Sequence, residues 1–364
     1  MGEVPVLSEN LFSTVQDKSK YNSIELFAGA GGMAIGMEKA GFHHVLLNDF
    51  DRAATQTLKE NRLHWNVVHG DISKIDFTPY ENIDLLTGGF PCQAFSYAGR
   101  KLGLEDTRGT LFYEFARALK ESKPKVFLAE NVKGLKSHDG GRTLEAMVSV
   151  FESMGYDVLE PTVLKGIHYN VPQKRERLFI VGIKKEYAPH VSFSFPTPSS
   201  KIYTLKDALK KGELFSCDVP VSEGQQYPEK KKKILELVPP GGYWRDLPLD
   251  IQKEYMMKSF YLGGGKTGIA RRISWDEPSL TLTCSPAQKQ TERCHPDETR
   301  PFQVREYARI QTFPDEWKFE GSMNQQYKQI GNAVPVNLSY AIGKSLRTLL
   351  DDIYSSTGFK NNNV

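Results

Sequence analysis

Residues 24–41 read IELFAGAGGMAIGMEKAG, and this pattern decides the fold. The apolar start predicts a buried strand, the glycines at 29–32 predict a tight turn, and residues 33–40 predict a helix that ends at Gly41. A strand, a glycine turn and a helix in this order form the first unit of a doubly wound, mostly parallel sheet. No lysine follows the glycines, so the turn favours an uncharged or cationic nucleoside over a nucleotide.

Three further apolar runs predict strands, and a turn with a chemically useful side chain follows each of them. These predicted strands span residues 44–47, 66–69 and 83–86. Asp49, Asp71 and Cys92 follow them in that order. The carboxyl ends of parallel strands share one edge of a sheet, where such sheets bind ligands, and the acid after the second strand is placed to hold ribose hydroxyls. Either aspartate could instead cap the helix that follows it.

Residues 85–96 read LLTGGFPCQAFS and present a cysteine at a rigid turn. Gly88 and Gly89 let the backbone turn and Pro91 restricts it, so Cys92 stands at a strand end, as a nucleophile would. The alternative is a buried structural cysteine, and this stretch alone leaves both interpretations open. A later predicted strand, 125–129, ends at Glu130 and would bring a carboxylate to the same edge.

Residues 173–177 read QKRER and precede the apolar run 178–182. Because Arg175 and Arg177 stand two apart at a predicted strand start, we expect them to project on one side. They form either an ion-paired strand edge or a clamp for an anion or a base.

The composition of all 364 residues is that of a globular protein, with 39% apolar and 25% charged residues and a net charge of +3. No run of 18 apolar residues and no signal peptide is recognisable, so we expect a cytoplasmic protein. The four cysteines contain no CxxC pair, which argues against a disulfide framework and against a structural metal site.

The chain changes character after the apolar run near residue 182, becoming richer in proline, glycine and lysine. We therefore expect an N-terminal tail at 1–20, a catalytic and cofactor-binding domain at 21–183 completed by 330–350, a second domain and hinge at 184–329, and a C-terminal tail at 351–364. Between residues 229 and 272 basic residues exceed acidic ones, which indicates a surface that faces a polyanion. A solvated lysine-rich loop is the alternative.

Six motifs, in order and spacing, resemble those of the DNA (cytosine-5) methyltransferase family and its bacterial restriction–modification members. They are FAGAGG (27–32), GGFPCQAFS (88–96), AENVKGL (129–135), QKRER (173–177), REYARIQTFPD (305–315) and QIGNAVPV (329–336). The resemblance implies an α/β, Rossmann-like methyltransferase domain that uses S-adenosylmethionine, with a smaller, loop-rich target-recognition domain. It implies no metal.

The resemblance also assigns roles to single positions. Cys92 corresponds to the nucleophile that adds to C6 of cytosine, Glu130 to the residue that helps protonate N3, and Arg175 to the motif arginine, with Arg177 orienting its neighbours. The positions that correspond to cofactor-binding residues are Phe27, Gly29, Gly31, Asp49, Phe50, Asp71, Ile72, Pro91 and Asn332. Many members have glutamate where this chain has Asp49, which affects affinity more than the identity of the ligand.

The target-recognition domain would bind double-stranded DNA at a short specific site, with the target cytosine flipped out of the helix. The expected DNA-binding residues are Arg108, Lys266, Arg271, Arg272, Gln288, Lys289 and Arg293. We expect a monomer that protects DNA from a cognate restriction endonuclease without forming a stable complex with it. The alternatives are a tRNA cytosine-5 methyltransferase and a non-catalytic DNA-binding regulator.

Overall fold

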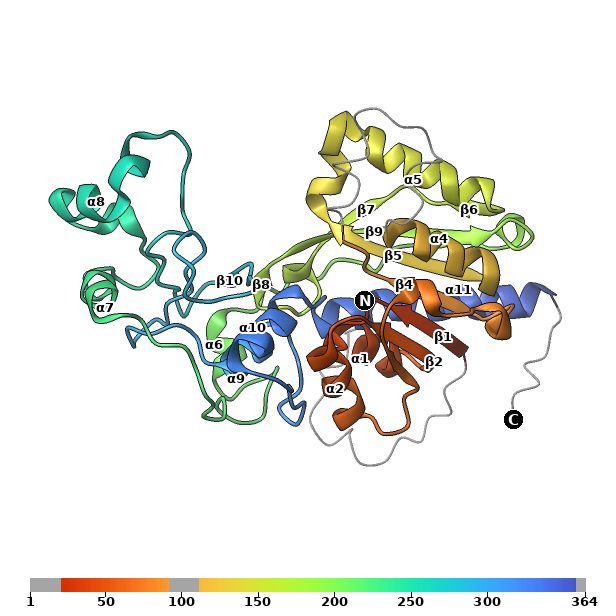
Figure 1. Cartoon of the computed structure of the whole chain (residues 1–364), viewed down its shortest axis with the longest axis horizontal. Helices are drawn as coiled ribbons and strands as arrows, with labels where there is room; N and C mark the ends of the chain where they lie inside the picture. Colours follow the sequence, from red (N-terminus) through yellow and green to blue (C-terminus); the bar gives the residue numbers. More distant parts are fainter. Residues whose placement is uncertain (1–20, 92–110, 358–364) are drawn as a thin grey trace. The chain divides into compact units, whose positions relative to one another are not determined.

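The computed structural model describes residues 21–91 and 111–357, and within them the chain forms two compact units (Figure 1). The sheet unit contains the described residues up to Lys165, Glu176–Pro198 and the residues from Val336 onward. The second unit contains Gly166–Arg175 and Ser199–Pro335. These divisions differ from the expected ones, because residues 166–175 and 330–335 belong to the second unit and residues 184–198 to the sheet unit.

An eight-stranded, mostly parallel sheet forms the centre of the sheet unit, as predicted. Its strands are β1 (Tyr21–Leu26), β2 (Phe42–Asp49), β3 (Val67–His69), β4 (Leu85–Gly88), β5 (Val126–Val132), β6 (Tyr156–Val158), β7 (Thr162–Lys165) and β9 (Glu176–Lys184). They lie in the order β3-β2-β1-β4-β5-β9-β6, with β7 also paired to β9. Strands β1 to β5 run parallel and β9 runs antiparallel to β5, so the first five strands end at one edge.

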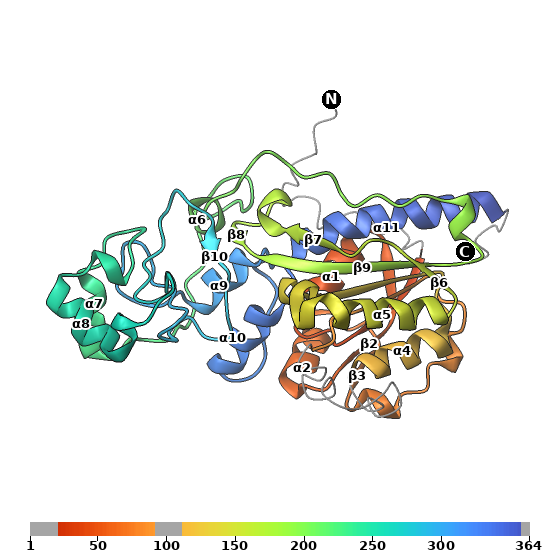
Figure 2. The same ribbon diagram turned by 90° about the horizontal axis from the view of Figure 1, so that it is seen from above.

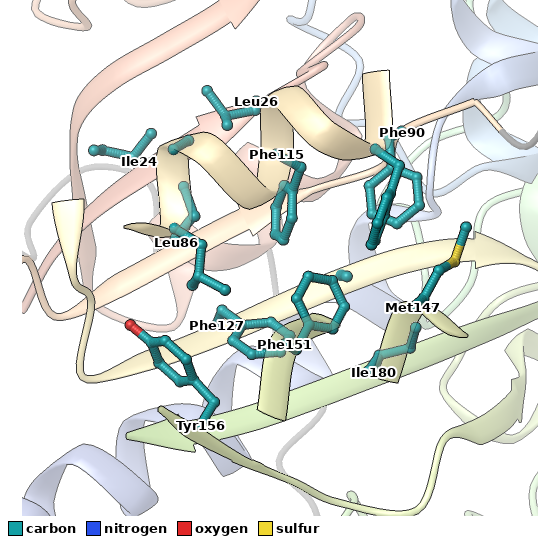
Figure 3. Close-up of a cluster of buried hydrophobic side chains, with 14 of the residues drawn as sticks. Ile24, Leu26, Leu86, Phe90, Phe115, Phe127, Met147, Phe151, Tyr156 and Ile180 are labelled. Carbon is teal, nitrogen blue, oxygen red and sulfur yellow. The ribbon is translucent and has the colours of Figure 1, made fainter. Parts of the chain in front are cut away.

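Helices pack on both faces of this sheet (Figure 2). They are α1 (Gly32–Lys39), α2 (Arg52–Asn61), α4 (Leu111–Ser122), α5 (Arg142–Ser153) and α11 (Val336–Thr357). Side chains of α4 and α5 join those of β1, β4, β5 and β9 in one hydrophobic cluster (Figure 3). Its centre is the ring of Phe127, which lies 4.6 Å from the ring of Phe151 and 5.3 Å from that of Tyr156, centroid to centroid.

Helix α11 lies against α1, although the two are separated by most of the chain. A Cβ atom on Gly36 would lie 2.4 Å from the Cβ of Ser339, and one on Gly343 would lie 2.8 Å from the Cβ of Ala40. Glycine at both places lets the helix backbones approach closely. The helix continues to Thr357, so the C-terminal tail does not begin at residue 351 as predicted.

The second unit is built from short elements, as its composition predicted. They are α6 (Leu205–Leu209), α7 (Glu229–Glu236), α8 (Leu249–Met256), α9 (Val304–Ile310), α10 (Met323–Asn332) and the parallel pair β8 (Gln173–Lys174) and β10 (Ser279–Leu280). Trp244, Leu235, Met256 and Ile269 are among the buried residues of its core. In the described part of the chain, no helix has the length and apolar character needed to cross a bilayer.

Candidate active site

The glycine turn after β1 has the backbone geometry that its sequence predicts. Gly29 and Gly31 have φ angles of 54° and 85°, a region that glycine occupies readily. Phe27 has a φ of 58°, which is strained for a bulky side chain. Such strain persists where neighbouring contacts hold the backbone, and it concentrates at ligand-binding turns.

Asp49, at the end of β2, fixes this turn. Its Oδ2 accepts a hydrogen bond from the Gly29 N–H at 2.8 Å, and its Oδ1 accepts one from the Asp51 N–H at 2.7 Å. The helix cap that we considered for Asp49 belongs to Asp51, whose carboxylate accepts from the Ala53 N–H at 3.0 Å. Phe50 follows Asp49 and is 77% exposed, so an aromatic ring stands beside the fixed carboxylate and can stack on a flat ligand.

Asp71 has the capping role that we had considered for it. Its Oδ1 accepts a hydrogen bond from the Ser73 N–H at 3.0 Å at the start of the 3₁₀ helix Ile72–Lys74. That hydrogen bond favours the ionised form and lowers the pKa of Asp71. Ile72 is buried and Pro91 is exposed. Cys92 and Arg108 lie outside the described residues.

Glu130, near the end of β5, pairs with Arg177 of the neighbouring strand β9. The Arg177 Nε lies 2.8 Å from the Glu130 Oε1, and the two side chains are only 13% and 12% exposed. Glycine at position 89 leaves room for this carboxylate, because a Cβ there would lie 2.8 Å from the Glu130 Oε2. The Asn131 side chain donates to the Phe90 carbonyl at 2.9 Å and so ties the turn after β4 to β5.

Arg175 and Arg177, which we expected to project on one side, have different partners. Strand β8 ends at Lys174 and β9 begins at Glu176, so Arg175 lies at a break and belongs to the second unit. Its side chain is 1% exposed, and it donates to the carbonyls of Leu282 at 3.2 Å and Gly331 at 3.0 Å.

Asn332 also lies in the second unit, next to the same arginine. The Asn332 carbonyl accepts from Arg175 at 3.4 Å, and its Oδ1 lies 3.1 Å from the Cys284 Sγ. Arg175 therefore joins the Leu282 segment to the turn that ends α10. Nearby, Gln173 accepts from the Leu282 N–H at 2.8 Å and donates to the Gln311 Oε1 at 2.9 Å.

Two of the expected DNA-binding arginines are structural. Arg272 is 4% exposed, and its guanidinium donates to four backbone carbonyls and to the Thr299 hydroxyl. Because a guanidinium has five N–H groups, none of them remains for DNA. Arg293 is 5% exposed and donates to the carbonyls of Thr281 and Glu292. Tertiary acceptors thus bury both side chains, which disfavours a contact of either arginine with DNA.

The other expected DNA-binding residues of the second unit differ in how far protein contacts occupy them. Lys266 donates to the carbonyls of Leu262, at 2.7 Å, and Ser259, so it holds its own loop. Lys289 is exposed but donates to the Tyr255 carbonyl at 2.6 Å. Gln288 is also exposed, and Arg271 is half-buried.

Glu25 is a buried carboxyl group near the glycine turn that the motifs did not single out. It is fully buried on β1, shortly before the glycine turn, and among the residues that the structure describes neither carboxylate oxygen has a hydrogen-bond partner within ordinary geometry. Burial raises its pKa to about 8, although the nearby Ala34 N–H and Thr87 hydroxyl partly oppose this. The sequence signal was the charge itself, which interrupts an otherwise apolar strand.

Replacing Glu25 with glutamine should make stability less dependent on pH. Between the ordinary pKa of 4.5 and about 8 the folded state keeps a proton that the unfolded state has lost, so wild-type stability falls as pH rises through this window. At pH 7 to 8, E25Q should be more stable by roughly 3–4 kcal/mol. Urea unfolding from pH 5 to 9 measures this, with E152Q, at an exposed glutamate of α5, as control. Parallel curves for wild type and E25Q would contradict it.

The burial of His44 acts in the opposite direction and must be separated from the effect of Glu25. Its ring lies between the Ser23 hydroxyl at 3.0 Å and the Ala34 carbonyl at 2.9 Å, and burial lowers its pKa to about 4. An imidazole that is held neutral contributes stability that is lost as pH falls from 6.5 towards 4. Because both proteins share His44, the difference between wild type and E25Q isolates the carboxyl group.

A family model described as C-5 cytosine-specific DNA methylase matches residues 21–348 of this chain. The type II methyltransferase M.Eco47II of Escherichia coli is 69% identical over 334 residues, which cover 92% of this chain and 80% of that protein. M.PspPI of Psychrobacter sp. (strain TA137) is 62% identical over 338 residues, which cover 93% of this chain and 81% of that protein.

Among solved structures, a prophage-encoded DNA modification methyltransferase from E. coli has a similar fold. The TM-score is 0.68 at 23% identity, and the match covers 91% of this chain and 99% of that one. At this identity the likeness concerns the fold alone.

Proposed function

Because this chain belongs to the C-5 cytosine-specific DNA methylase family, we propose that Cys92 is its nucleophile and that Glu130 protonates N3 of the target cytosine. The observation that carries the proposal is the pair of Glu130 and Arg177, which lies at the carboxyl edge of the sheet with Glu130 beside Gly89. The enzyme is a DNA cytosine-5 methyltransferase, and the proposal concerns which of its residues act.

The chemistry explains why these residue types are needed. Cytosine C5 is a poor nucleophile, and it becomes enamine-like when a thiolate adds to C6 while N3 gains a proton. The Cys92 sulfur would form the bond to C6, and Glu130 would hold the proton at N3. After C5 has gained its methyl group, a base such as water takes the C5 proton, the C6–S bond breaks, the thiolate leaves and N3 returns its proton to Glu130. Arg177 orients the Glu130 carboxylate throughout.

The methyl donor is S-adenosylmethionine, which supplies an electrophilic methyl group when it is bound. The residues at the ends of β1 and β2 fit such a ligand. The strained turn at Phe27 brings backbone close to a ligand, the fixed Asp49 carboxylate can accept from ribose hydroxyls, and the exposed Phe50 ring can stack on adenine. Gly29 and Gly31 shape the same turn. Asp71, Ile72, Pro91 and Asn332 complete the proposed set.

The substrate is double-stranded DNA at a short specific site. We assign the recognition of this site to the second unit, which would be the target-recognition domain. Arg108, Lys266, Gln288 and Lys289 remain candidates for contacts with phosphates or bases. The enzyme would act as a monomer in the bacterial cytoplasm and protect DNA from a cognate endonuclease. The high identity to type II methyltransferases supports this role.

Covalent trapping tests the proposal. Duplexes that contain 5-fluorocytosine block the last step because fluorine cannot leave as the proton does, so the enzyme should remain bound to DNA after denaturation when S-adenosylmethionine is present. Sequencing the captured DNA from a randomised library would give the recognised site. C92S should form no such complex while it keeps its affinity for DNA. Capture of C92S, or capture of fluorinated RNA instead of DNA, would refute the proposal.

A further inference from the structure

One arginine of the second unit is held in place by its neighbours but has no acceptor for its side chain. The other buried or half-buried arginines between residues 270 and 335 donate to protein oxygens: Arg272, Arg293, Arg300, Arg305 and Arg309. The Arg271 guanidinium makes no hydrogen bond or ion pair with any described residue, and its Nε is buried. The two terminal nitrogens of Arg271 are not buried, so they remain open to an acceptor from outside the protein.

The backbone at Arg271 is fixed on both sides. Ala270 has a φ of 48°, and its N–H donates to the buried Glu292 carboxylate. The Arg271 carbonyl accepts from the Cys294 N–H at 3.0 Å, and Arg272 is anchored by all five of its N–H groups. Such a residue loses little conformational freedom when it binds, which suits recognition in one defined geometry.

A second positive charge lies close to Arg271. Burial lowers the pKa of Arg293, and the charge of Arg271 lowers it further. The Arg293 guanidinium donates hydrogen bonds to the Thr281 carbonyl and the Glu292 carbonyl. Arg271 and Arg293 therefore carry two positive charges, and Arg271 has no acceptor among the described residues. This arrangement favours an electron-rich hydrogen-bond acceptor from outside the protein.

Contacts within the second unit connect Arg293, the charged neighbour of Arg271, to Arg175. Arg293 reaches the carbonyl of Thr281, and the next residue, Leu282, accepts from Arg175 at 3.2 Å. Arg175 in turn reaches Gly331 at 3.0 Å. Arg293, whose charge Arg271 faces, is thus linked to Arg175 through Thr281 and Leu282.

We propose that Arg271 reads a guanine of the recognised DNA sequence, donating to the O6 and N7 atoms of its major-groove edge. This inference rests on the proposed function and adds a specificity-determining residue to it. A guanidinium fork matches those two acceptors, and this is the commonest specific contact between proteins and DNA. The fixed backbone of Arg271 favours a base edge over a phosphate, because mobile lysines contact a phosphate equally well.

Substitution of single atoms in the DNA tests the contact. The probes are duplexes with the trapped recognition sequence in which one guanine at a time is 7-deazaguanine, which lacks the N7 acceptor. Equilibrium binding should weaken roughly tenfold for wild type at one guanine. R271A should bind the unmodified site roughly ten- to hundredfold more weakly, and 7-deazaguanine at that position should cause it no further loss. Its affinity for non-specific DNA should change less than threefold.

Two further variants make the test decisive. R271K keeps the charge but loses the fork, so it should lose the same discrimination while melting at the wild-type temperature, and it serves if R271A does not fold. R245A, at an exposed arginine that lies over the Trp244 ring, should bind every probe as wild type does. Equal losses of R271A on all DNA, or additive losses at every guanine, would overturn the inference. Trapping by wild type would still succeed in that case, so the two proposals fail separately.

Discussion

Glu130→Gln is expected to lower the rate of methyl transfer by roughly two to four orders of magnitude. Glutamine keeps the shape of the side chain and can still accept from the Arg177 Nε, which lies 2.8 Å from the carboxylate in the wild type. It cannot deliver a proton to N3, so the addition of the thiolate to C6 loses its driving force. Single-turnover transfer of a labelled methyl group measures the effect, with DNA affinity measured in parallel.

The neighbouring acid provides the control for this prediction. Glu176 pairs with Lys133 at 2.8 Å at a more exposed position on β9, and E176Q should transfer methyl groups within twofold of wild type. If E130Q stayed within tenfold of wild type, Glu130 would not be the proton donor. Equal losses in E176Q and E130Q would instead point to a general effect of charge.

A substitution at Gly89 would alter the position of the Glu130 carboxylate without replacing it. A Cβ at position 89 would lie 2.8 Å from the Glu130 Oε2, so G89A should displace the carboxylate. A displacement near 1 Å can lower a rate about a hundredfold. We therefore expect G89A to be slower than wild type but faster than E130Q.

Gly182→Ala is expected to give the largest loss of stability, roughly 2–4 kcal/mol. Gly182 stands opposite Phe127 in the antiparallel pair of β9 and β5, and a Cβ on it would lie 2.0 Å from the Phe127 Cε1. The ring cannot move aside easily, because Phe151 and Tyr156 pack against it (Figure 3). Urea unfolding measures the loss.

The control for G182A is the same substitution at a glycine that has space around it. Gly134 is exposed with no atom within 4 Å of an added Cβ, so G134A should stay within about 0.5 kcal/mol of wild type. Shortening the ring should relieve the clash, so the double variant G182A/F127L should be more stable than the sum of the single effects implies. Strict additivity would show that the ring is not the obstacle.

Most of the fold could be predicted from local patterns in the sequence. The alternation of apolar strands, glycine turns and helices in residues 24–41 and after is set by backbone sterics and burial, so it can be read without the structure. The places of Asp49 and Glu130 at strand ends followed from the parallel order alone. The structure confirmed the mostly parallel sheet and the loop-rich second unit.

The remaining differences come from tertiary contacts that no local pattern records. Arg175 and Arg177 stand two apart, but the chain passes from one unit to the other between them, which separates their partners. Arg272 and Arg293 look like surface charges in a basic stretch, yet carbonyls from distant loops bury them. The length of α11 likewise depends on contacts such as that of the Tyr21 hydroxyl with Asp351, at 2.7 Å.

Because helix α11 is synthesised after the second unit, the order of synthesis affects how the chain folds. Residues 166–175 and 199–335 leave the ribosome before α11 does, so the second unit has all of its sequence while the sheet unit still lacks its last helix. Until then the surface of α1 around Gly36, Met37 and Ala40 lacks the partner that α11 provides. The sheet unit can therefore bury this apolar surface only after the whole second unit has been synthesised.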